Sequence, residues 1–313
     1  MMRVLVTGAS GFVGEHLVRV LRGRGDEVSA WGLAGAGEGF TSVDMRDAAA
    51  VHTHDFRGLD AVIHLAGLAH VSRSFERPAQ YVCENSAMQV NLMEALLAQR
   101  SPATVLVVSS GAVYAGGGEP LTELSPVRAS NPYVVSKLTQ ELLAAYYAER
   151  GLRVIVARPF NHVGPGQQPG FLVADIASRL ARLEHEGGGT LTAGNLETVR
   201  DYSDVRDVAA AYAQLITDGR PGETYNVCSG VSRSGREILA GLLALSSVPV
   251  TLAEDAGLYR PTDTLEVRAS NAKLCSHTRW RPAIPLEVTL SDTLEYWRAR
   301  VSSVPAGTSR SGV

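Results

Sequence analysis

Tyr133 and Lys137 are the residues of this chain whose types and spacing point most directly to chemistry. Asn131 is a good helix N-cap and Pro132 suits the first helical position, so we expect a helix that starts here and carries both side chains on one face. A nearby ammonium group favours the phenolate of a tyrosine and lowers its pKa from about 10. The spacing alone is common by chance, but Lys137 and Lys273 are the only lysines among 29 basic residues. We therefore predict that the pair is catalytic.

A glycine-rich turn near the amino terminus predicts a binding site for a dinucleotide. Residues 3–6 are an apolar run, and Gly8, Gly11 and Gly14 follow at G-x-x-G-x-x-G spacing before apolar residues recur at helical spacing. This is the pattern of a strand, a tight turn and a helix. Glycines let the backbone approach a pyrophosphate, and the helix start offers free N–H groups and the positive end of its dipole.

Further apolar segments alternate with helical patterns, which favours an α/β fold with a doubly wound parallel sheet of the Rossmann type. The predicted strand 104–110 has an entirely apolar centre, residues 105–108, as expected of a parallel strand buried on both faces. Ligands of such sheets bind at the carboxyl ends of the strands, so we expect Gly67, Ser110 and residues 160–162 to converge. The predicted strands after the first are 27–31, 61–67, 104–110 and 153–158.

These features, with residues 43–47 and 64–67, together resemble the extended short-chain dehydrogenase/reductases. That family comprises nucleotide-sugar epimerases, dehydratases and ketoreductases, and the resemblance covers almost the whole chain. It implies that Ser110 hydrogen-bonds the reacting oxygen and that Tyr133 passes the proton. Lys137 would lower the tyrosine pKa and bind the nicotinamide ribose.

The same resemblance implies a nicotinamide cofactor. Asp44 would hold the adenine amino group, and Asn85 would support the active site. His70 and Arg73 would line the cleft. The predicted catalytic residues are Ser110, Tyr133 and Lys137, and the predicted cofactor-binding residues are Gly8, Gly11, Phe12, Val13, Gly14, Asp44, Met45, Leu65, Ala66, Gly67, Asn85, Ser109, Tyr133 and Lys137.

A narrower resemblance is to the reductases of GDP-linked 6-deoxy-4-ketohexoses. It implies a nucleoside-diphosphate sugar as substrate, either GDP-linked or dTDP-linked. Asn161 and Arg200 would grip the diphosphate, and Arg260 would reach the diphosphate or its ribose, since guanidinium groups bind phosphate oxygens bidentately. The segments that carry this resemblance are 158–166, 194–207, 225–230, 260–263 and 280–287. The predicted substrate-binding residues are Ser110, Asn161, Asn195, Arg200 and Arg260.

Two departures from the family patterns bear on the reaction. Dehydratases of this family carry an acidic residue two positions after the strand-end hydroxyl, whereas Gly111 and Ala112 follow Ser110 here. Neither side chain can act as a base, which disfavours elimination of water. NAD-using members place a carboxylate at the end of the second strand, and residues 30–35 contain no acid. We therefore favour a 4-ketoreductase that draws NADPH or NADH from solution, with NADPH preferred.

Two other functions stay open at this point. A 4-epimerase, or a dehydratase whose acid comes from elsewhere in the fold, could use the same scaffold. A non-catalytic relative that serves as a ligand sensor or protein-binding module is the third reading, and the intact set of Ser110, Tyr133 and Lys137 argues against it.

The composition limits the class of protein. With 313 residues, of which 45% are hydrophobic, the chain can bury a full core. A net charge of −3 argues against a nucleic-acid partner. No apolar run approaches the ~18 residues of a membrane span, and we expect no signal peptide, since the chain starts directly with the first predicted strand. The three cysteines lack metal spacing and suit a reducing compartment, so we expect a cytoplasmic protein without a metal site.

The family implies two lobes that are discontinuous in the sequence. We expect a dinucleotide-binding lobe made of residues 1–158 and 200–232, and a smaller α+β substrate lobe made of residues 159–199 and 233–301. The tail 302–313 is rich in small and polar residues and is expected to be disordered. An apolar stripe on the helix after Asn131 would join two copies as a homodimer, although core packing explains it equally well. Its residues are Leu138, Leu142, Leu143 and Tyr146.

Overall fold

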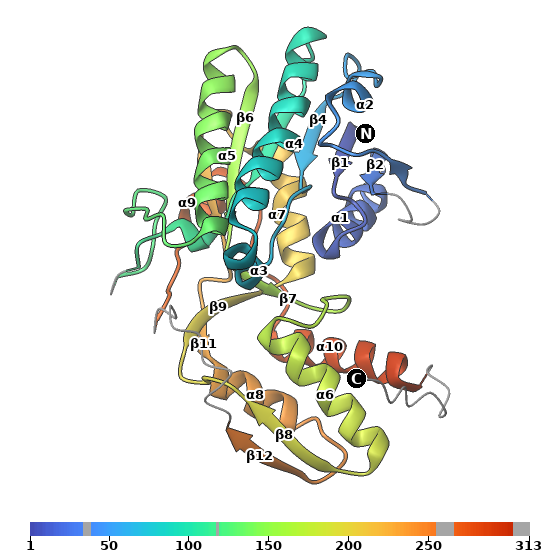
Figure 1. Cartoon of the computed structure of the whole chain (residues 1–313), viewed down its shortest axis with the longest axis vertical. Coiled ribbons are helices and arrows are strands. Elements are labelled where there is room, and N and C mark those ends of the chain that lie inside the picture. The colour runs from blue at the N-terminus through green and yellow to red at the C-terminus, as the bar shows by residue number, and fades with distance from the viewer. Residues whose placement is uncertain (34–38, 117–118, 255–265, 303–313) are drawn as a thin grey trace.

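The computed structural model describes residues 1–33, 39–116, 119–254 and 266–302. Its main feature is a seven-stranded sheet in the order β10-β6-β5-β4-β1-β2-β3, in which every neighbouring pair is parallel (Figure 1). The strand order runs outward in both directions from the centre, which confirms the doubly wound, Rossmann-type α/β fold. The strands are β1 (Arg3–Thr7), β2 (Glu27–Gly32), β3 (Thr41–Ser42), β4 (Ala61–His64), β5 (Thr104–Val108), β6 (Arg153–Pro159) and β10 (Thr224–Val227).

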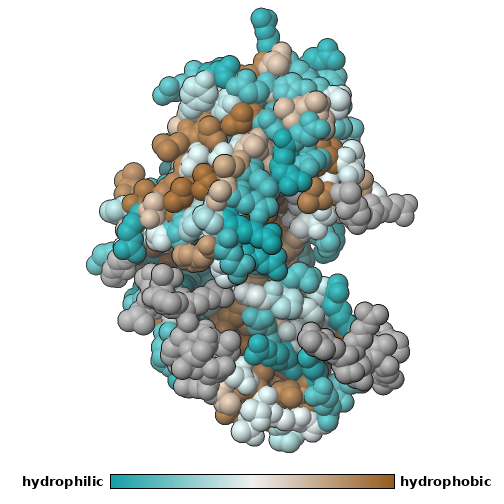
Figure 2. Space-filling model, in the orientation of Figure 1, coloured by the Kyte–Doolittle hydropathy of each residue, from teal (hydrophilic) through white to brown (hydrophobic). Residues whose placement is uncertain are grey.

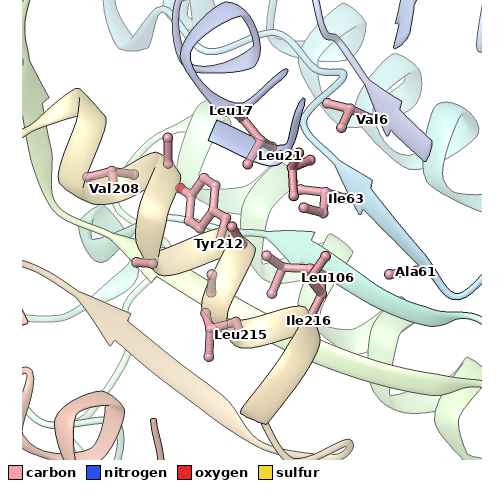
Figure 3. Close-up of a cluster of buried hydrophobic side chains, with 14 of the residues drawn as sticks. Val6, Leu17, Leu21, Ala61, Ile63, Leu106, Val208, Tyr212, Leu215 and Ile216 are labelled. Carbon is pink, nitrogen blue, oxygen red and sulfur yellow. The ribbon is translucent and has the colours of Figure 1, made fainter. Parts of the chain in front are cut away.

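Helices cover both faces of this sheet. On one face α1 (Phe12–Gly23) packs on α7 (Val205–Asp218), whose buried side chains face strands β1, β4 and β5 (Figure 3). On the other face lie α2 (Ala48–His52), α4 (Pro78–Ala98) and α5 (Pro132–Glu149), whose apolar residues form a second buried cluster with the sheet. Burial on both sides explains why the central strands are mostly apolar.

Two of the strands end earlier than the sequence predicts. β4 stops at His64 and β5 at Val108, so Gly67 and Ser110 lie in the loops just beyond. One further ladder hydrogen bond continues from each, from Leu65 N to the Thr7 carbonyl and from Ser109 N to the Ala157 carbonyl. The backbone then turns away from the sheet, and this leaves the crevice at the carboxyl ends of the strands.

Two small sheets lie beyond the carboxyl ends of β6 and β10, in the lower part of Figure 1. The strand β9 (Val199–Asp204) pairs with β7 (Asn161–Val163) in parallel and with β11 (Ser232–Ser234) antiparallel. A further pair consists of β8 (Gly189–Ala193) and β12 (Val250–Glu254). The helices α6 (Leu172–Glu186), α8 (Gly235–Leu243) and α10 (Leu286–Ser302) form a separate core with these strands.

Shorter helices connect the larger elements. They are α3 (Val71–Glu76), the 3-10 turn η1 (Gly111–Val113) and α9 (Ala272–His277). Across the described ranges, every helix is too short or too polar to cross a membrane.

Candidate active site

The helix α5 starts as its sequence predicts and delivers Tyr133 and Lys137 to one face. The Asn131 side chain accepts a hydrogen bond from Val134 N at 2.9 Å, and Pro132 occupies the first turn. The Lys137 ammonium lies 5.9 Å from the centroid of the Tyr133 ring, and both residues are buried. The N-cap at Asn131 and one helical turn therefore place the side chains of Tyr133 and Lys137 on the same face of α5.

Ser110 joins the pair from the end of β5. Its side chain caps η1 by accepting from Ala112 N at 3.1 Å, which holds the hydroxyl at the crevice. The same hydroxyl hydrogen-bonds the Tyr133 phenol. The structure thus brings together the three side chains that the sequence singled out.

The pKa of Tyr133 corrects one expectation. Burial raises this pKa above its usual value of 10, and the hydrogen bond from Ser110 offsets only part of that rise. The Lys137 ammonium does not lower it as predicted, because it is directed elsewhere, donating to the Val108 carbonyl at 2.9 Å and to Gln140 Oε1 at 3.0 Å. Burial in turn lowers the pKa of Lys137 to about 8, against an opposing effect of Glu141.

Asn85 ties the α4 helix to the loop after β4. Its side-chain oxygen accepts from Leu68 N at 2.7 Å, and its amide group donates to the Ser136 hydroxyl at 3.0 Å. A side chain at Gly67 would lie 3.3 Å from the Asn85 oxygen and 4.0 Å from Lys137 Nζ. Gly67, Asn85 and Lys137 therefore line one small space.

The sequence reasoning missed a buried polar network beside these residues. Glu141 forms a bidentate ion pair with Arg158, at 2.8 and 2.7 Å, and it also accepts from the Ser109 hydroxyl at 2.5 Å. Arg158 further donates to the Tyr114 hydroxyl at 3.0 Å. Since Glu141 follows Lys137 by four positions, helical spacing was a signal that could have found it.

The glycine turn has the geometry that a pyrophosphate site requires. Gly8 has a φ of +66°, and a side chain there would lie 2.7 Å from Ala66 N. At Gly14 a side chain would lie 2.5 Å from the Gly8 carbonyl oxygen. Gly11 is the N-cap of α1 and has no side chain to cap it, so the first N–H groups of the helix face outward. The turn therefore fits a dinucleotide.

The other residues predicted to contact the cofactor border this turn. The Phe12 ring stacks on His162 with centroids 6.0 Å apart and an interplanar angle of 10°. Val13 and Leu65 pack against the core under α1, and Ala66 packs against the core under α4. The Phe12–His162 stack connects the glycine turn with β7, a contact that the sequence did not indicate.

The predicted adenosine end is more exposed. Asp44 forms a bidentate ion pair with Arg46, at 2.9 and 2.7 Å, and these hydrogen bonds lower the pKa of its carboxyl group to about 2. Met45 is buried in the core. At the end of β2, Trp31 packs on His54, and no carboxylate follows within the described part of the turn, which ends at Leu33.

The residues predicted to bind the substrate are spread over the smaller sheets. Asn161 starts β7, and Arg200 lies on β9, where its guanidinium donates to the Val199 carbonyl at 2.9 Å. The Asn195 side chain accepts from Glu197 N at 2.9 Å and so shapes its own loop. Arg260 lies outside the described residues.

Gly111 is packed against an aromatic ring. A side chain at this position would lie 2.8 Å from the ring of Phe160, and Ala112 beside it is exposed. There is no room for an acidic side chain at Gly111 without displacing Phe160. Two small residues without titratable groups, Gly111 and Ala112, therefore follow Ser110 in the chain.

The chain also matches a family of known proteins. Residues 4–228 match the model of the "NAD dependent epimerase/dehydratase family", which is well over half of the chain. The chain belongs to this family. As a member, it is a nucleotide-sugar enzyme with a Rossmann-type fold, and relatives in the family bind NAD or NADPH.

Two relatives within this family illustrate its range. GDP-6-deoxy-D-mannose reductase from Pseudomonas aeruginosa is 36% identical over 304 residues, which is 96% of this chain and 98% of that protein. A dTDP-glucose 4,6-dehydratase from Streptomyces griseus is 29% identical over 97% of this chain and 98% of that protein.

Two solved structures are also similar to this one. The structure of RMD from Pseudomonas aeruginosa complexed with NADPH superposes with a TM-score of 0.87 and 35% identity, covering 96% of this chain and all of that one. A UDP-glucose 4-epimerase from Thermus thermophilus in complex with NAD gives 0.80 and 32%, covering 95% of this chain and 99% of that one.

Proposed function

We propose that this chain is a 4-ketoreductase of the epimerase/dehydratase family. Its substrate would be a nucleotide-linked 4-keto-6-deoxyhexose of the GDP-4-dehydro-6-deoxy-mannose type, and its cofactor NADPH or NADH. The support is the cluster of Ser110, Tyr133 and Lys137 beside the glycine turn, together with the 36% identity to a GDP-6-deoxy-D-mannose reductase.

Each side chain of the cluster has its own role in the proposed reaction. A reduced nicotinamide cofactor, held by the turn of Gly8, Gly11 and Gly14, would supply the hydride that C4 needs. The hydroxyls of Ser110 and Tyr133 hydrogen-bond the carbonyl oxygen, where negative charge develops, and a fixed donor of that kind contributes about 2.7–4 kcal/mol. Tyr133 gives its proton to this oxygen, an acid catalysis of about 10²–10⁴-fold. Lys137, whose ammonium donates to the Val108 carbonyl and to Gln140 in this structure, would hold the ribose of the nicotinamide, as the family resemblance implies.

The observation that carries the choice of reaction is the identity of the two residues after Ser110, Gly111 and Ala112. A dehydratase needs an acid–base residue next to the substrate carbon, and the two positions after Ser110 hold a glycine in contact with Phe160 and an alanine. With no titratable group at these positions, the site is suited to hydride and proton transfer at one carbon. A reduction of the keto group needs no further acid–base residue.

NADPH is the cofactor that we favour. In the described part of the turn after β2 there is no carboxylate to hold the two hydroxyls of an adenosine ribose. The similar structure from Pseudomonas aeruginosa was solved with NADPH. Both observations fit an enzyme that takes reduced cofactor from solution and releases it after each turnover.

A 4-epimerase is the second candidate. It would use the same hydroxyls of Ser110 and Tyr133 with a tightly held NAD, and the chain is 32% identical to a UDP-glucose 4-epimerase complexed with NAD. The two candidates differ in where the hydride comes from, because an epimerase recovers it from its own substrate.

One experiment separates them. Purified protein is mixed with NADPH or NADH and a panel of GDP- and dTDP-linked 4-keto-6-deoxyhexoses, and the absorbance of the reduced cofactor is followed. We expect oxidation of the cofactor only when a keto-sugar is present, in stoichiometric amount. Protein that arrives with bound NAD, interconverts nucleotide hexoses at C4 and consumes no added cofactor would instead be an epimerase, and the reductase proposal would be withdrawn.

We also propose that two copies associate through α5. The side chains of Leu142 and Tyr146 are 73% and 52% exposed, and Val135 on the same helix is 36% exposed. Hydrophobic residues gather over this region, at the upper left of Figure 2. Leu138 and Leu143, which the sequence placed in the same stripe, are partly buried and pack against the protein's own core. An exposed apolar face of this kind favours an interface.

A further inference from the structure

Two arginines face each other across a pair of antiparallel strands. In the register of β9 and β11, Arg200 is the direct partner of Arg233. Residues in direct register project from the same face of a sheet, with Cβ atoms about 4.5–5.5 Å apart. Two arginine side chains therefore start from neighbouring positions on one face of the sheet, although they are far apart in the sequence.

Asn161 lies on this face as well. Strand β7 pairs with β9 in parallel, and its Asn161 is the partner of Tyr202, which follows Arg200 by two positions and shares its face. Tyr202 packs in the core formed with α6 and α8, so this face looks toward those helices. One face of the three-stranded sheet thus carries Asn161, Arg200 and Arg233.

The guanidinium of Arg233 is held weakly by the protein itself. Its one acidic neighbour in the described part of the chain is Glu237, at 3.9 Å, the outer limit of an ion pair. The Glu237 carboxylate is already engaged at the start of α8, where it accepts from Ser234 N at 2.7 Å and from the Ser234 hydroxyl at 2.9 Å. Arg233 otherwise donates to the Ser232 carbonyl at 3.3 Å.

Like charges in direct register destabilise an antiparallel pair. An anion with two negative phosphoryl groups would reverse the sign of that interaction, since each arginine fork matches phosphate oxygens bidentately. A single phosphate offers fewer oxygens to two forks than a diphosphate does. The pair therefore fits a diphosphate better than a monophosphate.

We infer that Arg233 is a binding residue for the diphosphate of the nucleotide sugar, acting opposite Arg200. This inference rests on the proposed function and assigns Arg233 to the substrate site, where neither the sequence motifs nor the family patterns had placed it. Binding would bring two positive charges and the Asn161 amide around one diphosphate.

The test compares Arg233→Gln with wild type by calorimetric titration of GDP, GMP and, in parallel, dTDP and dTMP. Loss of a charge-assisted contact should weaken diphosphate binding roughly 10- to 100-fold. Monophosphate binding should weaken less, so the ratio of diphosphate to monophosphate affinity falls. Arg233→Lys, which keeps the charge but not the fork, should recover part of the loss. In turnover assays KM for the keto-sugar should rise while kcat stays unchanged.

Arg182→Gln is the matched control, because it removes an exposed arginine from α6 in the same part of the molecule. It should bind GDP and dTDP as wild type does, and every variant should bind NADPH normally. If Arg200→Gln loses diphosphate affinity and Arg233→Gln does not, the inference is overturned while the proposed function stands. If the wild-type protein binds neither GDP nor dTDP, the proposed function falls and the inference with it.

Discussion

Arg158 and Glu141 form a buried, bidentate ion pair that fastens the end of β6 to the helix carrying Tyr133 and Lys137. Their side chains are only 9% and 14% exposed, and the Ser109 hydroxyl donates to the same carboxylate. Ser109 directly precedes Ser110, so this single carboxylate connects α5, β5 and β6 at the point where the candidate catalytic groups meet.

Glu141→Gln should destabilise the protein strongly. Removing one partner of a buried pair leaves an uncompensated charge and costs about 3–5 kcal/mol in the free energy of unfolding, whereas exposed pairs contribute at most about 1 kcal/mol. Urea unfolding of the wild type and of each variant measures these changes in the free energy of unfolding. Asp55→Asn is the matched control, since Asp55 pairs with Arg57 at side-chain exposures of 61% and 72%. Equal losses for the two variants would contradict the structural role of Glu141.

Tyr133→Phe should abolish most turnover and leave ligand binding intact. The variant removes the proton donor, so we expect kcat to fall about 10²–10⁴-fold, while the dissociation constants of NADPH and GDP stay as in wild type. Steady-state kinetics and titration calorimetry provide the two readouts. Tyr146→Phe, on the exposed side of the same helix, should retain full activity. A Tyr133→Phe protein with most of its turnover number would refute the role assigned to this phenol.

Lys137 should titrate near pH 8. Burial lowers its pKa to about 8, against an opposing effect of the Glu141 carboxylate. The ammonium form therefore predominates below pH 8 and is lost as the pH rises through that value. The chain has two lysines, so selective ¹⁵Nζ-lysine labelling gives two NMR signals, and Lys273→Arg assigns them. We expect Glu141→Gln to move the Lys137 titration lower, and a midpoint above pH 10 in wild type would contradict the environment described here.

His64 should make stability depend on pH. Burial, assisted by the nearby Lys137 charge, lowers its pKa from 6.5 to about 3. Because the folded-state pKa is depressed, the unfolded chain binds the proton more readily, and stability is lost as the pH falls from 6.5 toward 3. One such group accounts for about 2 kcal/mol between pH 7 and pH 5.

Urea unfolding at the two pH values measures this slope. His64→Gln should remove that part of the pH dependence even if it lowers stability at both values. His185→Gln, which removes an exposed histidine of α6, is the control for histidine loss and should keep the wild-type slope. A His64→Gln variant with an unchanged slope would show that the proton binds elsewhere.

Leu142→Glu should dissociate the proposed dimer. A carboxylate placed in an apolar interface loses its water without gaining a partner, which opposes association. Sedimentation velocity of the wild type and the variant tests this directly. Leu252→Glu, at an exposed position of β12, is the matched control and should leave the mass unchanged. A monomeric wild type would remove the proposed interface from α5.

The sequence by itself determined the local parts of this protein. The glycine turn between β1 and α1, the apolar central strands and the start of α5 at Asn131 all follow from interactions within a few residues. Backbone conformation, capping and helical spacing act at that range, so the Tyr133/Lys137 pair could be read from the chain alone.

Tertiary structure decided the features that depend on long-range packing. Tyr133 has a raised pKa because distant elements bury it, and no spacing of charges along one helix reveals that desolvation. Glu141 contacts Arg158 and Ser109, and Arg200 lies opposite Arg233 in register, only because the sheet order and strand pairing bring these segments together. Hydrogen-bond register and burial are properties of the whole fold, whereas periodicity and capping belong to each segment.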